Sequence, residues 1–564
     1  MTKRLAYVIF FLTIVFFSAF FAWPIWQVLK GGFVDINGHF TLAYILAVFD
    51  SHIYLHGILN SILLGIATTA LALIIALPLA YFADRYQFPG RKIFTNIVLL
   101  PIMLPPFVGA IGIQQIFGTR GVINLILLKF GVIDGSHLID WLGDYKFLGM
   151  CLLNALSLYP ILYLNILSSL ANIDPAMEEA AGNLGCHGLR RYFKITFPLI
   201  RSGVFAGSTL VFIWAFTELG VPLIFDYNRV VSVQIYNGLK EIGNQPVPYA
   251  LVSVVLALAL IFYLIGKIAA GRRNYPMMAK ASHGASLHKI GIFRKILCCL
   301  LFVGITFIAV LPHLSVAITS FAGDWYNSIL PNIWTLTNYK ITLGHPLTIP
   351  AIKNSLVYSC FATLVAMMLG IAIAFVIVRS KVWGRNLLDT IAMLPLAVPG
   401  LVMAFGYLAM SQKGRIFEFL NPVENPTTLL VLSYSVRKLP FMVRSAVAGL
   451  QQMSYTYEEA AQNLGCPPLK ASVVITFPLI ISNLLAGGLL VFSQTMLEVS
   501  DSLILAQKQQ FYPITKAIYE LMNLFGDGPF LACALGVWSM AFLATTIIGA
   551  SIFMGKNFGA IFRA

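Results

Sequence analysis

The sequence contains little charge. Only 10% of its 564 residues are Asp, Glu, Lys or Arg, whereas 59% are hydrophobic. Soluble domains have about 25% charged residues, so this composition excludes an ordinary soluble globular protein. Many apolar runs are longer than the roughly 18 residues that indicate a membrane-spanning helix. We therefore expect an all-α protein that crosses a membrane many times.

A nucleotide-binding motif is also missing. A P-loop has the pattern G-x-x-x-x-G-K-[ST], in which backbone amides hold the phosphates and the hydroxyl binds Mg²⁺. The nearest approach is Gly549 followed by Gly555-Lys556-Asn557, where the spacing is wrong by one residue and the hydroxyl is absent. Nucleophiles, bases and metal ligands do not cluster either. The sequence therefore predicts no catalytic residues and no cofactor; the protein is not expected to be an enzyme.

Neither the cysteines nor the histidines form a recognisable site. Cys186 and Cys466 lie at matching points of a repeated segment. This segment is on the predicted cytoplasmic side, where disulfides are not expected. His52 and His56 are four residues apart, but two histidines without a carboxylate cluster are too few for a closed metal site. We expect no resident metal. Membrane topology explains the net charge of +15, so no nucleic-acid partner is expected.

Twelve apolar runs predict twelve transmembrane helices joined mostly by short loops. Lys and Arg are in excess in alternate connections, which the positive-inside rule makes cytoplasmic, together with both termini. The predicted helices lie near residues 5–29, 58–82, 93–118, 147–171, 202–225, 249–269, 296–320, 353–378, 387–410, 427–449, 481–505 and 529–554.

One polar segment occurs twice in this apolar chain. Residues 178–200 read EEAAGNLGCHGLRRYFKITFPLI and residues 458–480 read EEAAQNLGCPPLKASVVITFPLI, with 15 of 23 positions identical and no gap. The offset between the copies is 280 residues, and other pairs, such as Gly90 and Gly384, recur at an offset of 294. Each half holds six predicted helices in the same orientation. We therefore expect two parallel six-helix repeats, with a transport pathway between them.

The repeated segment resembles the EAA loop of ABC importer permeases of the type I fold. Two copies in one chain look like the fused permeases of ferric iron uptake, with thiamine and phosphonate relatives close by. The resemblance extends over essentially the whole chain and implies the type I permease fold. In that family, the first short helix of the loop inserts into a cleft of the ATPase and transmits its closure. The resemblance implies ATPase-coupling roles for Glu178, Glu179, Ala180, Ala181, Gly185, Glu458, Glu459, Ala460, Ala461 and Gly465.

Local signals within the loops suit docking. Asp174-Pro175 predicts a helix start, because proline is favoured in the first turn. The glutamates that follow lie near the positive end of that helix, which stabilises them. Gly185 and Gly465 can adopt a left-handed backbone conformation, so we expect the chain to turn there between two short helices.

The repeat divides the chain into three parts. Residues 1–270 form the first permease half, with an EAA loop at about 172–201. Residues 271–292 form a polar, basic cytoplasmic linker that is too short for a folded domain. Residues 293–564 form the second half, with an EAA loop at about 452–480.

Prolines interrupt the third predicted helix of each half. Pro101, Pro105 and Pro106 in the first half match Pro395 and Pro399 in the second. Each proline removes an amide donor and bends the helix. We therefore expect both helices to be kinked.

Ionisable residues also fall within predicted helices. Glu218 and Glu498 are equivalent at the offset of 280, Asp501 follows on the same helix face, and Arg437 lies in the tenth helix. An ionisable group at membrane depth is costly and normally faces a cavity or a partner. These residues either line the translocation pathway, or Glu498 or Asp501 pairs with Arg437 to hold helices together. The sequence leaves both interpretations open.

The leading functional hypothesis is a permease subunit of a binding-protein-dependent ABC importer in the inner membrane. The resemblance implies a separate cytoplasmic ATPase, in two copies for the two loops, and an external substrate-binding protein; lipid surrounds the helices. ATP is used only by the partner. Ferric iron is the first choice of substrate, with thiamine, phosphonates or sugar phosphates as alternatives. The competing hypothesis is an ion-coupled secondary transporter of twelve helices, which would have no need of paired docking loops. A third hypothesis, a membrane-embedded enzyme, ranks far behind, because the sequence has no cluster of catalytic residue types.

Overall fold

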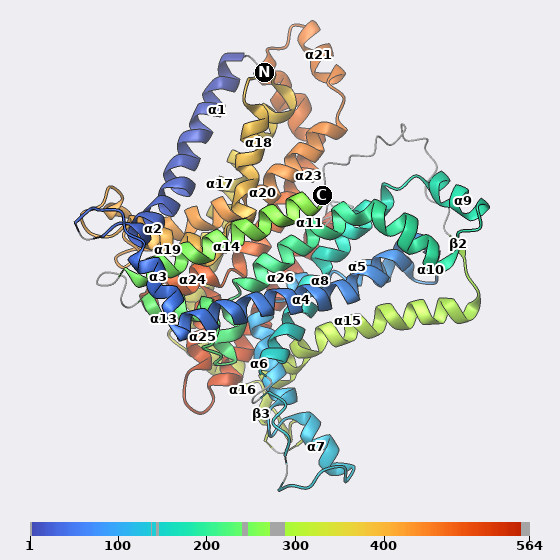
Figure 1. Cartoon of the computed structure of the whole chain (residues 1–564), viewed down its shortest axis with the longest axis vertical. Helices are drawn as coiled ribbons and strands as arrows, with labels where there is room; N and C mark the ends of the chain where they lie inside the picture. The colour runs from blue at the N-terminus through green and yellow to red at the C-terminus, as the bar shows by residue number, and fades with distance from the viewer. Residues whose placement is uncertain are drawn as a thin grey trace. The chain divides into compact units, whose positions relative to one another are not determined.

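A computed structural model of the protein describes residues 3–553, apart from residues 36, 137, 143–145, 240–245, 271–287 and 327. The chain is mostly helical and divides into two compact units. Unit 1 comprises Met1–Leu55, Ser232–Ala257 and Leu336–Ala564, and unit 2 comprises His56–Val231 and Leu258–Thr335. Figure 1 shows the helices of both units in the colours of the chain order.

Unit 2 contains most of the first repeat. Its long helices α8 and α11 pack against each other, and α6 packs against α15. Its elements are α4 (His52–Arg85), β1 (Tyr86–Gln87), α5 (Arg91–Ile97), η2 (Leu100–Met103), α6 (Pro106–Phe117), α7 (Val122–Lys129), α8 (Lys146–Ala171), α9 (Pro175–Asn183), α10 (Gly188–Arg191), η3 (Tyr192–Thr196), α11 (Phe197–Phe216), α12 (Gly220–Ile224), β2 (His288–Lys289), α15 (Ile292–Ser320), β3 (Ala322–Asp324) and β4 (Ile333–Trp334). The parallel pair β1–β2 and the antiparallel pair β3–β4 are its short sheets.

Unit 1 contains most of the second repeat. Its core is formed by α17, α20 and α23, which pack against one another. Its elements are α1 (Lys3–Phe17), η1 (Ser18–Ala22), α2 (Trp23–Phe33), α3 (Ala43–Asp50), α13 (Val231–Gly238), α16 (Thr337–Gly344), α17 (Thr348–Arg379), α18 (Arg385–Met393), η5 (Leu394–Leu396), α19 (Gly400–Met410), η6 (Glu418–Leu420), α20 (Thr427–Gln452), α21 (Thr456–Asn463), α22 (Pro468–Ala471), η7 (Ser472–Thr476), α23 (Phe477–Met496), α24 (Ser500–Leu505), η8 (Gln509–Phe511), α25 (Ile514–Met522) and α26 (Gly528–Phe553). Helix α14 (Val247–Ala270) begins in unit 1 and ends in unit 2, and the first turn of α4, before His56, also belongs to unit 1.

The long apolar helices confirm a membrane protein that crosses the bilayer many times. Ten helices of the described residues are long and apolar enough to span a membrane, or eleven if one bent pair counts as a single span. We expected twelve. The predicted tenth span is present as the 26-residue helix α20. Because it carries Arg437, Lys438 and Arg444, it is too charged to count among the helices that are apolar enough to span a membrane.

The third span of each repeat is broken, as the prolines predict. In the first repeat, α5, η2 and α6 follow one another, with Pro105 in an extended conformation before α6. In the second, the segment 385–396 and α19 meet at an angle of 98° at Pro399. Because proline cannot donate a backbone hydrogen bond, the helical ladder ends at these points.

The first helix of each repeat packs against the third span of the other repeat. In unit 1, α2 packs along α19, and in unit 2, α15 packs along α6. The contacts are equivalent, because a Cβ atom on Gly406 would meet the carbonyl oxygen of Pro24, and one on Gly112 would meet that of Pro312. Gly112 and Gly406 are related by the offset of 294. The glycines are therefore needed for close backbone approach.

This exchange of first helices means that the compact units differ in composition from the sequence halves 1–270 and 293–564. The predicted halves describe the duplication in the sequence. That they are also separate structural domains stays a prediction. Most of the predicted linker, residues 271–287, lies outside the described residues.

Candidate functional site

The first EAA loop (residues 172–201) is a helix, a turn and a second short helix. Helix α9 begins after Asp174, whose carboxylate accepts a hydrogen bond from the backbone N–H of Ala176 at 3.0 Å. The helix start was predicted from the Asp-Pro pair, and the structure adds the side-chain cap. Gly185 follows the helix with φ +78°, and α10 and the π-helical turn η3 lead into α11. Figure 1 shows α9 and α10 at one end of the helices of their unit.

The second EAA loop (residues 452–480) repeats this geometry. Helix α21 is followed by Gly465 with φ +88°, then by α22, the π-helical turn η7 and α23. The predicted left-handed turn is therefore confirmed in both loops. Matching π-helical turns, which often mark functional sites, precede the Phe-Pro start of α11 and α23.

Glu178 points into the protein, where it forms the first loop junction with Arg85 and Thr196. Arg85 Nη2 donates to Glu178 Oε1 at 3.0 Å, and Thr196 Oγ1 donates to the same oxygen at 2.9 Å. The side chains of Arg85 and Glu178 are 6% and 8% exposed. Arg85 Nη1 also lies 3.1 Å from a carboxylate oxygen of Asp84. One buried carboxylate oxygen thus joins the ends of α4, α9 and η3.

Glu458 forms the second loop junction with Arg379 and Thr476. Arg379 Nε donates to Glu458 Oε1 at 3.1 Å, and Thr476 Oγ1 donates to that oxygen at 2.8 Å. The side chains of Arg379 and Glu458 are 8% and 2% exposed. Arg379 Nη2 also donates to the carbonyl oxygen of Met453 at 3.1 Å. In both repeats, therefore, an arginine and a threonine donate to one oxygen of the loop glutamate.

The rest of each loop is open to its surroundings. Glu179 and Glu459 are exposed, as are Ala180, Ala460 and both turn glycines, whereas Ala181 and Ala461 are more covered. Leu184 and Leu464, related by the offset of 280, are 87% and 90% exposed. An exposed apolar side chain beside an acidic one is a combination that a protein partner can cover.

The structure separates the paired glutamates that the sequence analysis grouped together. Glu178 and Glu458 are buried in ion pairs within the chain, and only Glu179 and Glu459 face outward. Sequence reasoning did not identify Arg85 and Arg379 as partners of the loops. A signal was available, because these arginines are related by the offset of 294 that relates other repeat positions.

Substituting the turn glycines tests the loop geometry. A Cβ atom at Gly185 or Gly465 would meet nothing within 4 Å, so a substitution acts on the backbone alone. For an L-residue the left-handed conformation costs about 1–2 kcal/mol, and a β-branched residue tolerates it least. If the loops couple a separate ATPase to transport, as the resemblance implies, Gly185→Val and Gly465→Val should lower the amount of substrate transported per ATP, with membrane insertion unchanged.

Purified protein yield measures insertion, and uptake with ATP hydrolysis measures coupling. Gly414→Val is the matched control, because Gly414 has φ +78° and open space around it but lies outside both EAA loops. Normal coupling in the Gly185→Val, Gly465→Val double variant would contradict a role of the turns.

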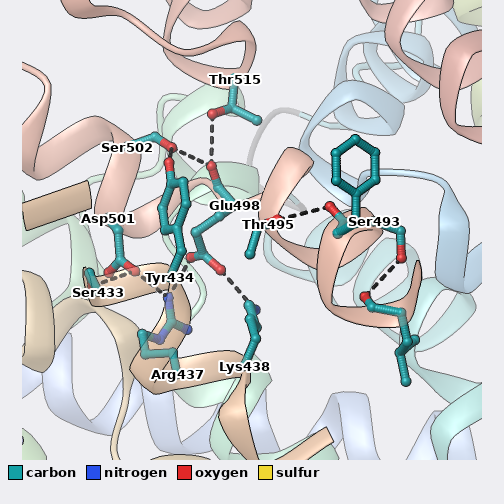
Figure 2. A network of polar contacts seen from close by, with 12 residues as sticks. Ser433, Tyr434, Arg437, Lys438, Ser493, Thr495, Glu498, Asp501, Ser502 and Thr515 are labelled. Atoms are coloured by element: carbon teal, nitrogen blue, oxygen red, sulfur yellow. Dashed lines mark hydrogen bonds and ion pairs between the residues drawn. The ribbon is translucent and has the colours of Figure 1, made fainter. Parts of the chain in front are cut away.

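A second cluster of charges is buried within unit 1. Figure 2 shows Arg437 on α20 between two carboxylates from the corner of α23 and α24. Its Nη1 donates to Glu498 Oε1 at 2.6 Å and to Asp501 Oδ2 at 2.9 Å, and Lys438 Nζ lies 2.9 Å from Glu498 Oε2. Two cations therefore face two anions. Asp501 is 0% and Glu498 7% exposed, a burial that ions tolerate only when they are well paired.

Hydroxyl groups add further hydrogen bonds around the ion pairs, although Asp501 Oδ1 is buried without a hydrogen-bond partner among the described residues. Ser433 Oγ donates to Asp501 Oδ2 at 2.9 Å, and Thr515 Oγ1 donates to the backbone carbonyl of Glu498 at 2.7 Å (Figure 2). These residues lie on α20, on α25 and at the corner between α23 and α24. The network thus ties together elements that are far apart in sequence.

The break in the third span makes room for Arg437. A Cβ atom on Gly400, the first residue of α19, would overlap the guanidinium group. Gly400 directly follows Pro399, where the span is broken. The guanidinium group therefore packs against the broken end of the span.

Glu218 has a different environment from its equivalent Glu498. Its Oε1 accepts hydrogen bonds from the backbone N–H groups of Gly220 at 3.1 Å and Val221 at 3.4 Å, at the start of α12. The position aligned with Arg437 in the first repeat is Ser157. The two repeats therefore differ in charge at this point.

The structure brings together three of the four residues predicted for a pathway. Arg437, Glu498 and Asp501 form the ion pairs that were the alternative interpretation, and Glu218 lies in the other unit. Whether any of them lines a pathway stays a prediction. Within the residues that the structure describes, no group of three or more His, Cys, Asp or Glu side chains could hold a metal ion.

Comparison with known proteins assigns the family. The family model described as binding-protein-dependent transport system inner membrane component matches the chain twice, over residues 76–274 and 366–551. The putative ferric transport system permease protein 1 of Haemophilus influenzae is 29% identical over 472 residues, which cover 82% of this chain and 70% of the relative.

Two other relatives show how far the likeness extends. The ferric transport system permease protein of Actinobacillus pleuropneumoniae is 28% identical over 81% of this chain, which spans 64% of that protein. The molybdenum transport system permease protein of Escherichia coli K12 is 28% identical over 37% of this chain and 91% of its own length. The two family matches cover more than half of the chain and include both EAA loops. The chain therefore belongs to the family of binding-protein-dependent transport system inner membrane components, the multi-pass permeases of ABC importers.

Proposed function

We propose that this permease carries ferric iron across the inner membrane, with energy from a separate ATPase that docks on the two EAA loops. The observation that carries the proposal is the duplicated loop geometry, in which Glu179 with Leu184 and Glu459 with Leu464 are exposed. Two matching loops fit two ATPase copies. The loops and both termini are cytoplasmic in this proposal, which agrees with the excess of Lys and Arg in the same set of connections.

Transport in this account requires no chemistry on the substrate. An external binding protein delivers the ion, and closure of the ATPase pair moves the loops, so that the pathway is exposed alternately to each side. The choice of ferric iron is supported by two relatives whose names state ferric transport and which match about four fifths of this chain.

Uptake of radioactive ferric ion by cells with and without the permease tests the substrate. We expect loss of the permease to abolish the high-affinity part of ferric uptake and to leave molybdate, phosphonate and thiamine uptake unchanged, because one binding protein supplies one substrate class. Re-expression of the intact chain is the control. Unchanged ferric uptake together with loss of one of the other substrates would contradict the assignment.

A further inference from the structure

We propose that Arg85 and Arg379 are positioning residues that pass movement of the EAA loops to the transmembrane helices α4 and α17. This inference rests on the proposed docking of an ATPase. It adds a defined route within this chain, through the first loop junction (Arg85, Glu178, Thr196) and the second (Arg379, Glu458, Thr476).

The location of the arginines suits transmission. Arg85 is the last residue of the 34-residue helix α4, and Arg379 is the last residue of the 32-residue helix α17. At 1.5 Å per residue, each helix is roughly 50 Å long. Force applied at its terminal residue therefore acts on the end of a complete membrane span.

The glutamates lie at the other side of the same contacts. Glu178 and Glu458 lie in the first turn of the loop helices α9 and α21, where the helix N-terminus stabilises a carboxylate. Each carboxylate also accepts from a threonine that directly precedes the next span, Thr196 before α11 and Thr476 before α23. A loop helix is thus joined to two spans at one oxygen atom.

Burial makes these contacts suitable for carrying force. Both arginine–glutamate pairs are less than a tenth exposed, so water screens their attraction far less than it screens a surface pair. The principal packing partners of α9 are the loop's own elements η3 and α10, and those of α21 are α22 and η7. The junctions therefore connect the otherwise exposed loop helices to α4 and α17.

The two junctions are not identical. Arg85 divides its Nη groups between Glu178 and Asp84, and its buried Nε has no hydrogen-bond partner. Arg379 uses Nε for Glu458 and Nη2 for the Met453 carbonyl, and its guanidinium carbon lies 5.5 Å from the centre of the Tyr455 ring. The junctions therefore need to be tested singly and together.

The test follows distances in the full complex with its ATPase. Nitroxide labels are placed at Ile74 on α4 and Met368 on α17, exposed positions related by the offset of 294, after replacement of the seven cysteines. Trapping with Mg-ATP and vanadate is expected to shift the distance between the labels. In Arg85→Gln with Arg379→Gln we expect bound ATPase and trapped nucleotide to be retained, but the distance shift to be lost.

Further variants separate transmission from folding. Thr196→Val with Thr476→Val replaces only two hydroxyl groups by methyl groups and should reduce the distance shift. The exchanged pair Arg379→Glu with Glu458→Arg should give a larger distance shift than Arg379→Gln alone, because it keeps an ion pair at the second junction. Arg444→Gln is the matched control, because Arg444 pairs with Asp389 at 3.3 Å but is 51% exposed.

A full distance shift in the Arg85→Gln, Arg379→Gln variant, or in the threonine variant if the arginine variant does not fold, would overturn the inference. Failure of the unsubstituted chain to hold any ATPase would instead overturn the proposed function.

Discussion

Replacing Glu179 and Glu459 by arginine in the same protein should remove the ATPase from the purified complex. Both carboxylates are exposed near the middle of the loop helices. A partner surface that binds these glutamates presents positive charge, and an arginine at either position would place a second positive charge against it. Such a juxtaposition costs several kcal/mol, and each 1.4 kcal/mol is a factor of about ten in affinity. We therefore expect affinity for the ATPase to fall at least ~100-fold, measured by co-purification and by titration of the ATPase onto the permease in nanodiscs.

The control for this experiment is Glu424→Arg, which reverses an exposed glutamate outside both loops and should leave the complex intact. Leu184→Asp with Leu464→Asp should weaken docking by a separate route, because two of the most exposed apolar side chains are lost. Retention of the ATPase by both double variants would contradict docking at the loops and favour a self-sufficient ion-coupled carrier.

Replacing Arg437 by methionine should strongly destabilise the folded protein. The variant leaves Asp501 and Glu498 buried with only Lys438 as a cation. Breaking a buried ion pair by removal of one partner costs about 3–5 kcal/mol. Thermal unfolding in detergent measures the effect. Arg444→Met on the same helix should cost about 1 kcal/mol or less, because that ion pair is half exposed.

Restoring the charge balance distinguishes an ionic cause from a packing cause. Arg437→Met combined with Asp501→Asn leaves the Lys438–Glu498 pair and no net charge, so most of the lost stability should return. If the double variant is as unstable as Arg437→Met alone, the shape of the guanidinium group against Gly400 dominates, and the ionic account of the network is wrong.

Local features of the fold were predictable because their causes are local. Three features follow from the local preferences of one or two residues: the helix start at Asp174-Pro175, the left-handed turns at Gly185 and Gly465, and the broken third spans. The repeat supplied a second example of the turns and of the broken spans. Two occurrences of the same pattern distinguished the loops from ordinary connections and led to the prediction that they are docking sites.

Features that depend on distant partners were not predictable in the same way. The inward turn of Glu178 depends on Arg85, which lies 93 residues earlier in the chain. The packing of α2 on α19 likewise joins segments from different repeats and has no local pattern. For Arg437 the sequence left both a cavity and a partner open, since a charge within a span needs one or the other. The pairing with Glu498 depends on a residue 61 positions away and could not be read from local sequence.

Labelling from each side of the membrane tests the central claim that both EAA loops are docking surfaces for a cytoplasmic ATPase. Leu184→Cys and Leu464→Cys, each in a cysteine-free background, are treated with a membrane-impermeant maleimide in inside-out and right-side-out vesicles. The account predicts labelling at both positions in inside-out vesicles alone, and protection of both when the ATPase is bound. Labelling from the outside, or equal labelling with and without the ATPase, would contradict it.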